Sequence, residues 1–334
     1  IKIKDYVSDD NSSDNAYAGA AIRVGAVEGT RYATSSLSGI TLKDIYFEDN
    51  ITSSYGGDGG AVHVNNNSSA TTTLTISGCI FDGNQTTSTS GYAHGGAFTL
   101  NSGNVVTIEN SVFFNNHAYK AGGAIAFYGD GSSTLTINNS TFYNNEGKAN
   151  SCTQCNAQIV VSGSGTQAYI NNSILYESDP DDSYHEDIIA RYSAAITVRN
   201  SIVERTDDYS SGSISTSSVS NSNPNWTDPA NNDFSLPDDS PAVDTASSTY
   251  APADDLNDLV RPQGQADDMG AYERRNTWDG STSTDWGTAA NWSEDIVPVS
   301  GRSPIIADVT NQPVISSDDG SSGDVTLEDI TINS

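Results

Sequence analysis

The sequence of 334 residues is poor in basic side chains, in sulfur and in long apolar runs. It holds 14 lysines and arginines against 43 aspartates and glutamates, a formal net charge of −29. Such a chain repels phosphate backbones, so nucleic acid is a poor partner. No apolar stretch reaches the roughly 18 residues of a membrane-spanning helix, and the first residues do not resemble a signal peptide. A membrane-spanning segment is therefore excluded for this sequence.

The apolar residues that are present recur in an eleven-residue motif, which argues against a disordered acidic chain. The motif aligns without gaps in seven places, roughly 30 residues apart, and repeats of that length are typical of solenoids. The copies are residues 1–11, 40–50, 74–84, 106–116, 135–145, 168–178 and 196–206.

Each position of the motif predicts a column of stacked residues. Positions one and three are apolar and position two is polar, as in Leu135, Thr136 and Ile137, so we expect a half-buried strand. The outward column at position two is Lys2, Thr41, Thr75, Thr107, Thr136, Tyr169 and Thr197. Asparagine recurs at positions five and eleven and phenylalanine at position eight. In parallel stacking these columns would bond amide to amide and stack ring on ring.

A second motif, GGA followed by an apolar residue, lies between the copies at residues 59–62, 95–98 and 122–125. Its glycines permit a sharp corner before a second short strand in each repeat. Two strands per repeat of this length predict an all-β right-handed parallel β-helix of about seven coils over residues 1–222, because parallel crossovers are right-handed.

The paired GGA and FxxN motifs resemble the repeats of polymorphic outer-membrane proteins and related bacterial autotransporter-type adhesins. Examples are Gly59 to Val62 with Phe81 to Asn84, and Gly122 to Ala124 with Phe142 to Asn145. The resemblance implies a β-helix that is secreted or displayed on a bacterial cell surface and binds other cells. Its partners would be glycans or surface proteins of host or neighbouring cells.

Residues 223–275 resemble the closing coil of secreted bacterial β-helix proteins, including those with sorting anchors. Asp255, Arg261, Asp268 and Glu273 fit the pattern that recurs there. They predict either a calcium or substrate site or, as we favour, a salt-bridged structural cap over the last core layer.

Residues 276–334 resemble the tryptophan-rich openings of repeat modules in large bacterial surface proteins. The end of the chain, VTLEDITINS, again matches the strand pattern of the repeats. We therefore expect the start of a second β-rich module, in a segment whose partners include the rest of a longer chain.

Enzymatic activity is the alternative function, because parallel β-helices include polysaccharide lyases and glycoside hydrolases. The sequence lacks the GHG and RxK elements of pectin-type hydrolases. Arg199 and Arg205 flank one coil, but no cluster of basic residues for a lyase is evident. We expect no catalytic residues and favour the adhesin.

Binding residues are expected in the variable turns and on the outward faces of strands. Tyr32, Tyr92 and Tyr184 lie in long turns and suit stacking on sugars or proteins. His63 should point outward beside Arg23 and Thr99, in a column that is either a ligand-binding face or, as we favour, a solvated surface.

Acidic turns offer hard oxygen ligands, so calcium is the one cofactor to consider. The candidate ligands are Asp179, Asp181, Asp182 and Asp187. Among the three cysteines, Cys152 and Cys155 form a CxxC that is a redox pair, half a zinc site or, as we favour for a secreted protein, a local disulfide. Cys79 occupies an inward column and should be a buried thiol.

Overall fold

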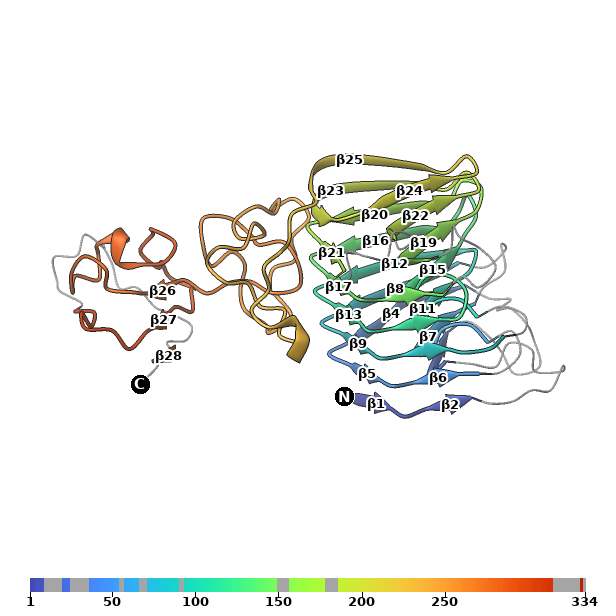
Figure 1. Ribbon diagram of the computed structural model, residues 1–334, viewed down its shortest axis with the longest axis horizontal. Coiled ribbons are helices and arrows are strands. Elements are labelled where there is room, and N and C mark those ends of the chain that lie inside the picture. The colour runs from blue at the N-terminus through green and yellow to red at the C-terminus, as the bar shows by residue number, and fades with distance from the viewer. Residues whose placement is uncertain are drawn as a thin grey trace.

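The computed structural model describes residues 1–8, 20–24, 36–53, 57–65, 71–89, 93–148, 156–177, 186–314 and 331–332. They form an all-β parallel solenoid of about eight turns, followed by two smaller units (Figure 1). The predicted parallel β-helix is thus confirmed as a fold class, with about eight turns rather than about seven.

Four sets of parallel strands make up the walls of the solenoid, and the first two sets share strand β23. The first stack is β4 (Leu37–Lys43), β8 (Thr72–Ser77), β12 (Asn104–Glu109), β16 (Thr134–Asn138), β20 (Gln167–Asn171), β23 (Ala195–Val203) and β25 (Ser213–Ser220). The second stack is β1 (Lys2–Lys4), β5 (Tyr46–Glu48), β9 (Ile80–Asp82), β13 (Val112–Phe114), β17 (Thr141–Tyr143) and β21 (Ile174–Tyr176).

Two further sheets close each turn. The five-stranded sheet is β2 (Val7–Ser8), β6 (Ile51–Thr52), β10 (Gln85–Thr86), β14 (His117–Ala118) and β18 (Glu146–Gly147). The seven-stranded sheet is β3 (Ile22–Val24), β7 (Val62–Val64), β11 (Phe98–Leu100), β15 (Ile125–Tyr128), β19 (Ala157–Ser162), β22 (Glu186–Arg191) and β24 (Thr206–Tyr209).

The eleven-residue motif contains two strands and a corner, not the single strand that the sequence suggested. In the copy at residues 135–145, β16 ends at Asn138, Asn139 adopts φ 41°, and β17 begins at Thr141. Asparagine tolerates this left-handed conformation better than most residues, because its short side chain bonds locally. Asn110, Asn172 and Asn200 hold the same corner in other turns, with φ values of 46°, 51° and 46°. The fifth position is therefore a corner residue.

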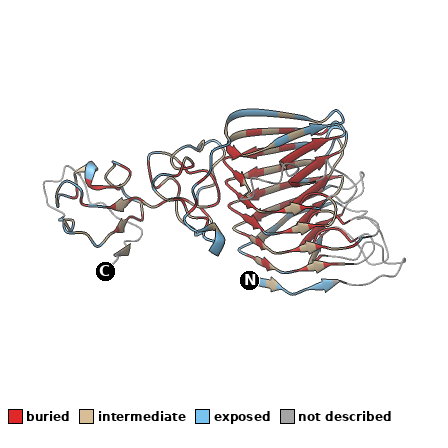
Figure 2. Ribbon diagram, in the orientation of Figure 1, coloured by how far each residue is buried: buried red, intermediate tan, exposed pale blue. Residues whose placement is uncertain are grey.

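Position eight forms the predicted aromatic stack inside the solenoid. Phe47, Phe81, Phe113 and Phe142 are fully buried, with ring centroids 4.7, 4.3 and 4.7 Å apart and rings within 10° of parallel. They form one core with the inward Leu, Ile and Val residues of the first and second stacks and of the seven-stranded sheet, which Figure 2 shows as the buried interior.

Position eleven forms the predicted amide ladder, and every member is fully buried. Each Nδ2 donates to the Oδ1 of the next asparagine, from Asn50 to Asn84 at 2.8 Å, to Asn116 at 2.9 Å and to Asn145 at 2.8 Å. Gln158 and Asp187 extend the ladder beyond Asn145, at 2.8 and 2.6 Å. Burial of these amides is tolerated because their hydrogen bonds are satisfied within the stack.

The first copy of the motif is out of register with the alignment made from sequence. Lys2 lies opposite Tyr46 in the second stack, not opposite Thr41 in the first, and Asp5 matches the corner of Asp49, with φ 56° and 53°. Both halves of the motif alternate inward and outward residues and end on an Asp or Asn corner. A single copy at the chain's start therefore fits either half.

Residues 223–275, here called the flank segment, pack along the side of the coils and not over the last core layer as we expected. Figure 1 shows them beside the second stack, while the serine-rich β25 forms the exposed last rung. Four apolar residues of the flank segment pack against outward apolar residues of the second stack. They are Trp226, Phe234, Leu236 and Met269. These outward residues are Val112, Phe114, Tyr143, Ile174 and Ile202. The segment covers an apolar flank that would otherwise face water.

The four residues of the predicted cap meet in a buried polar cluster inside the flank segment. Arg261 pairs with Glu273 at 2.6 Å and donates to the carbonyls of Asp268 and Gly270 at 3.1 and 3.0 Å. The Glu273 carboxylate also accepts the Asp268 amide at 3.0 Å, and Asp255 accepts the Glu273 amide at 2.9 Å. The cluster thus ties together the loops of the segment, beside the coils and not over the last core layer.

Burial of two carboxyl groups beside one guanidinium raises both of their pKa values. The pKa of Glu273 rises to about 8, through burial and the nearby Asp268, and the pKa of Asp268 rises to about 6, mainly through burial. In the unfolded chain both groups ionise near pH ~4. The folded state therefore holds a proton that the unfolded state releases between these values.

The flank segment should become less stable as pH rises, because the two carboxyl groups lose the protons that the folded state favours. Their contribution is fully present below about pH 4 and is lost as pH passes the raised pKa values, so we expect the free energy of unfolding to fall by on the order of a few kcal/mol between pH 5 and 8. Hydrogen exchange of residues 223–275, corrected for the intrinsic exchange rate, measures it. Asp268→Asn should flatten the profile, and a rise in stability across this window would contradict the assignment.

The unit after the flank segment is built around three tryptophans. Trp278, Trp286 and Trp292 are buried against one another, with ring centroids 4.6 to 6.3 Å apart. Strands β26 (Thr277–Trp278), β27 (Ile305–Ile306) and β28 (Thr331–Ile332) form a separate three-stranded parallel sheet. The described structure also contains two 3-10 turns, Pro229–Asn231 in the flank segment and Ala289–Asn291 in the tryptophan-rich unit. No helix among the described residues is long and apolar enough to cross a membrane.

Candidate functional site

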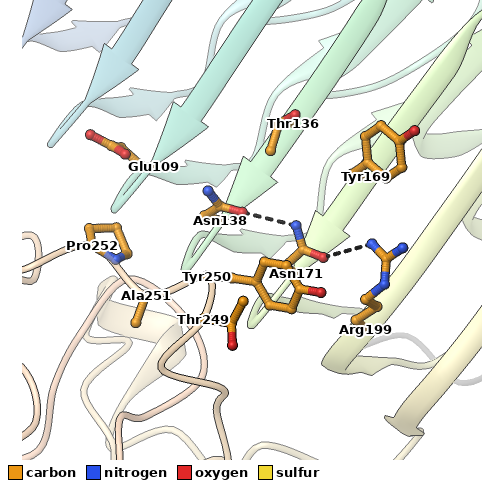
Figure 3. A pocket seen from close by; sticks show the side chains of 10 residues that line it. All are labelled: Glu109, Thr136, Asn138, Tyr169, Asn171, Arg199, Thr249, Tyr250, Ala251 and Pro252. Atoms are coloured by element: carbon orange, nitrogen blue, oxygen red, sulfur yellow. Dashed lines mark hydrogen bonds between the residues drawn. The ribbon is translucent and has the colours of Figure 1, made fainter.

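A groove of about 500 Å³ runs between the outer face of the first stack and the flank segment (Figure 3). We call it the flank groove. Its floor comes from β12, β16, β20 and β23, and its far wall is residues 249–252. The lining residues are Glu109, Thr136, Asn138, Tyr169, Asn171, Arg199, Thr249, Tyr250, Ala251 and Pro252.

The floor of the groove is a ladder of outward side chains at position four of the motif. Glu109, Asn138, Asn171 and Arg199 occupy this position in four consecutive turns, and strand pairing places them in one column. The Asn171 amide donates to Asn138 Oδ1 at 3.0 Å, and Arg199 donates to Asn171 Oδ1 at 3.3 Å. Hydrogen bonds therefore fix this column from Asn138 to Arg199, and the column has a carboxylate at one end and a guanidinium at the other.

Two tyrosine rings flank the guanidinium at the basic end. The Arg199 carbon Cζ lies 5.6 Å from the ring centre of Tyr169, in the neighbouring rung, and 5.8 Å from that of Tyr250 on the far wall. Contacts at this range are favourable cation–π interactions. The Tyr169 hydroxyl is held by Gln167 Oε1 at 2.6 Å. The basic end thus presents aromatic and cationic surface together.

The corner asparagines position the far wall of the groove. Asn172 Nδ2 donates to the Ser247 carbonyl and Asn172 Oδ1 accepts the Ser247 amide, both at 2.9 Å. Asn110 makes a single bond of this kind, from its Nδ2 to the Asp254 carbonyl. The chain between these anchors carries Tyr250 over the ladder. The fifth-position asparagines therefore serve both the corner of the coil and the docking of the wall.

The tyrosines predicted to bind ligands, Tyr32, Tyr92 and Tyr184, lie outside the described residues, as do Cys152 and Cys155. His63 is described and stands in register between Arg23 and Thr99 as expected. It is only 1% exposed, so the solvated surface that we favoured is wrong.

The buried state of His63 has a structural cause. Ala126, Val160 and Ile189 lie in the same outward column of the seven-stranded sheet as His63, and they are buried as well. This face of the sheet is therefore not open to solvent. Burial lowers the pKa of His63 to about 4, and its Nε2 lies 3.2 Å from the Asn101 amide. His63 is therefore part of the covered interior and not of an open binding face.

Of the four candidate calcium ligands, Asp179, Asp181 and Asp182 lie outside the described residues. Asp187 is buried at the end of the amide ladder, where its oxygens accept bonds from Gln158 and from the amides of Glu204 and Arg205. In the described part of the chain, no group of three or more potential ligands is arranged to hold a metal ion. Calcium at the turn before Asp187 stays a prediction.

Cys79 is a buried free thiol in the inward column, as expected, and burial raises its pKa to about 11. The flank groove was missed as a site, although Tyr169 stands out as the aromatic exception in its column. Asn138 and Asn171 carried the further signal of paired asparagines at positions four and five. Nothing in the sequence pointed to Tyr250.

Fold and groove together define the class of protein, a parallel β-solenoid with a polar groove between its coils and a flanking segment. Comparison of the chain with protein-family models, with curated proteins and with solved structures finds no match. The likeness of the repeats to bacterial adhesins accordingly rests on the GGA and FxxN motifs alone.

Proposed function

We propose that this chain is a non-enzymatic, glycan-binding segment of a secreted or cell-surface adhesin, with the flank groove as its binding site. The observation that carries the proposal is the pair of tyrosine rings beside a ladder of amide and carboxylate groups. Sugars offer apolar ring faces and many hydroxyls. Aromatic rings stack on the apolar faces of sugars. Amide and carboxylate oxygens accept hydrogen bonds from sugar hydroxyls, and amide N–H groups donate to them.

The shape of the groove supports a chain-like ligand. Its polar groups recur at every rung of the solenoid, about 4.8 Å apart, so successive sugars of one chain can each meet a polar side chain. The groove is open along its length and its floor is held in place by bonds within the ladder. A preorganised polar floor reduces the entropy that binding costs.

The alternative function, a polysaccharide lyase or glycoside hydrolase, has less support from this groove. Hydrolysis of a glycosidic bond commonly needs two carboxyl groups at a defined separation. Among the lining residues, all of which are described, Glu109 is the only carboxylate. The arrangement suits binding better than bond cleavage.

Tyr250→Ala should weaken glycan binding at least about tenfold, because it removes the aromatic ring of the far wall and leaves the column from Glu109 to Arg199 intact. A glycan array identifies the ligands, and calorimetry with the best ligand measures the loss. Tyr169→Ala, which removes the ring on the β20 side of the groove, should weaken binding of the same ligands.

Tyr209→Ala is the matched control, since Tyr209 is exposed on β24 outside the groove. It should bind as the wild type does. An array without any glycan hit, equal binding by Tyr250→Ala, or turnover of a bound polysaccharide would each reject the proposal.

A further inference from the structure

We propose that the flank groove selects acidic oligosaccharides, with a sugar carboxylate at Arg199 and the chain running along the solenoid axis toward Glu109. This inference rests on the proposed function and names the ligand class of the same site. It depends on the state of Arg199, on the polarity of the ladder and on the charge of the groove as a whole.

Arg199 lacks an ion-pair partner within the residues that the structure describes, whereas other arginines of the chain have one. Arg261 pairs with Glu273, and Arg274 with Asp238 at 2.5 Å. A guanidinium carries five N–H donors, and Asn171 takes one bond from Arg199. In a chain with 43 acidic residues, a partly exposed arginine that lines a groove is available for an external carboxylate.

The two tyrosine rings prepare Arg199 for such a contact. They hold the planar guanidinium from two sides, so less side-chain freedom is lost when its remaining donors bind an anion. The planar fork of arginine matches the two oxygens of a carboxylate, and such charge-assisted bonds are stronger than bonds between neutral groups. The same rings present stacking surface to the sugar that carries the carboxylate.

The ladder gives the ligand a direction. Glu109 stands three rungs from Arg199, roughly 14 Å away at the usual strand spacing. Its carboxylate repels an anionic group and accepts sugar hydroxyls, while the neutral amides of Asn138 and Asn171 lie between. An acidic sugar is therefore favoured at the Arg199 end and a hydroxyl-rich sugar at the Glu109 end.

The preference is tested with a matched pair of ligands: an oligomer of 1,4-linked galacturonic acid and its methyl ester, which keeps the rings and hydroxyls but loses the charge. Calorimetry at about 0.15 M salt limits long-range repulsion by the acidic protein. We expect the wild type to bind the acid about tenfold more tightly than the ester, the usual size of one charge-assisted hydrogen bond.

The variants separate the charge from the groove. Arg199→Gln should lose the preference, because it removes the charge that distinguishes the acid from the ester, and Glu109→Gln should bind the acid more tightly. Arg205→Gln makes the same charge change outside the groove and should keep the preference. Equal affinity of the wild type for acid and ester, or a preference that survives in Arg199→Gln, would overturn the inference.

Failure of the inference is distinguishable from failure of the proposed function. If the array shows neutral glycans that bind in a Tyr250-dependent manner while the acid oligomer does not bind, the groove is a glycan site without acid selectivity. If no glycan binds at all, both statements fall.

Discussion

Arg261→Ala is expected to destabilise the flank segment by about 3–5 kcal/mol, the usual cost of removing one partner from a buried ion pair. Arg261 and Glu273 are both almost fully buried, and the guanidinium also bonds two carbonyls of the segment. Two carboxyl groups share this one positive charge. Its loss leaves buried negative charge without compensation and two carbonyls without a donor.

The measurement is hydrogen exchange by mass spectrometry over residues 223–275. Protection there should fall steeply in Arg261→Ala, while the buried Phe and Asn columns of the solenoid should keep theirs. Arg302→Ala, at a partly exposed arginine of the C-terminal unit, serves as the control and should change little. A loss below about 1 kcal/mol in Arg261→Ala would show that the cluster does not hold the segment together.

Asn116→Ala should cost about 3 kcal/mol or more, because it breaks the buried amide ladder in its middle. Asn116 Oδ1 accepts both the backbone amide and the side-chain amide of Asn84, each at 2.9 Å. Its own Nδ2 donates to Asn145 Oδ1 and to the Phe81 carbonyl. The substitution leaves buried donors and acceptors on both neighbouring turns without partners.

Urea unfolding of the solenoid measures this cost, and Asn138→Ala provides the comparison. Asn138 is an asparagine of the next turn that faces the groove and is only partly buried. It should cost less than about 1 kcal/mol, since water replaces its hydrogen bonds. Equal losses in the two variants would mean that the buried ladder adds nothing beyond an ordinary surface amide.

The sequence predicted those features that depend on identical residues in successive turns. Phe142 and Asn145 were assigned correctly because each needs the same residue type one turn away, which the alignment shows directly. The corner at Asn139 was missed because an alternating strand and a strand–corner–strand unit share the same pattern. The shift of Lys2 has the same origin, since both halves of the motif end in an acidic or amide corner.

Features that depend on distant segments were not predictable in this way. The flank position of residues 223–275 left a trace in the outward Phe114 and Tyr143, which stand where lower turns carry Glu48 and Asp82. The floor of the groove was partly visible in Tyr169 and Arg199. Its far wall was not, because Tyr250 reaches the ladder only through the docking of Ser247 on Asn172.

The most direct test of glycan binding in the flank groove is an NMR titration of the side-chain amides with the galacturonic acid oligomer. The account predicts that the side-chain amide signal of Asn138, which is partly exposed in the groove, shifts on binding, while those of the fully buried Asn84 and Asn116 stay in place. Saturable binding that leaves Asn138 unchanged and shifts signals elsewhere would contradict it.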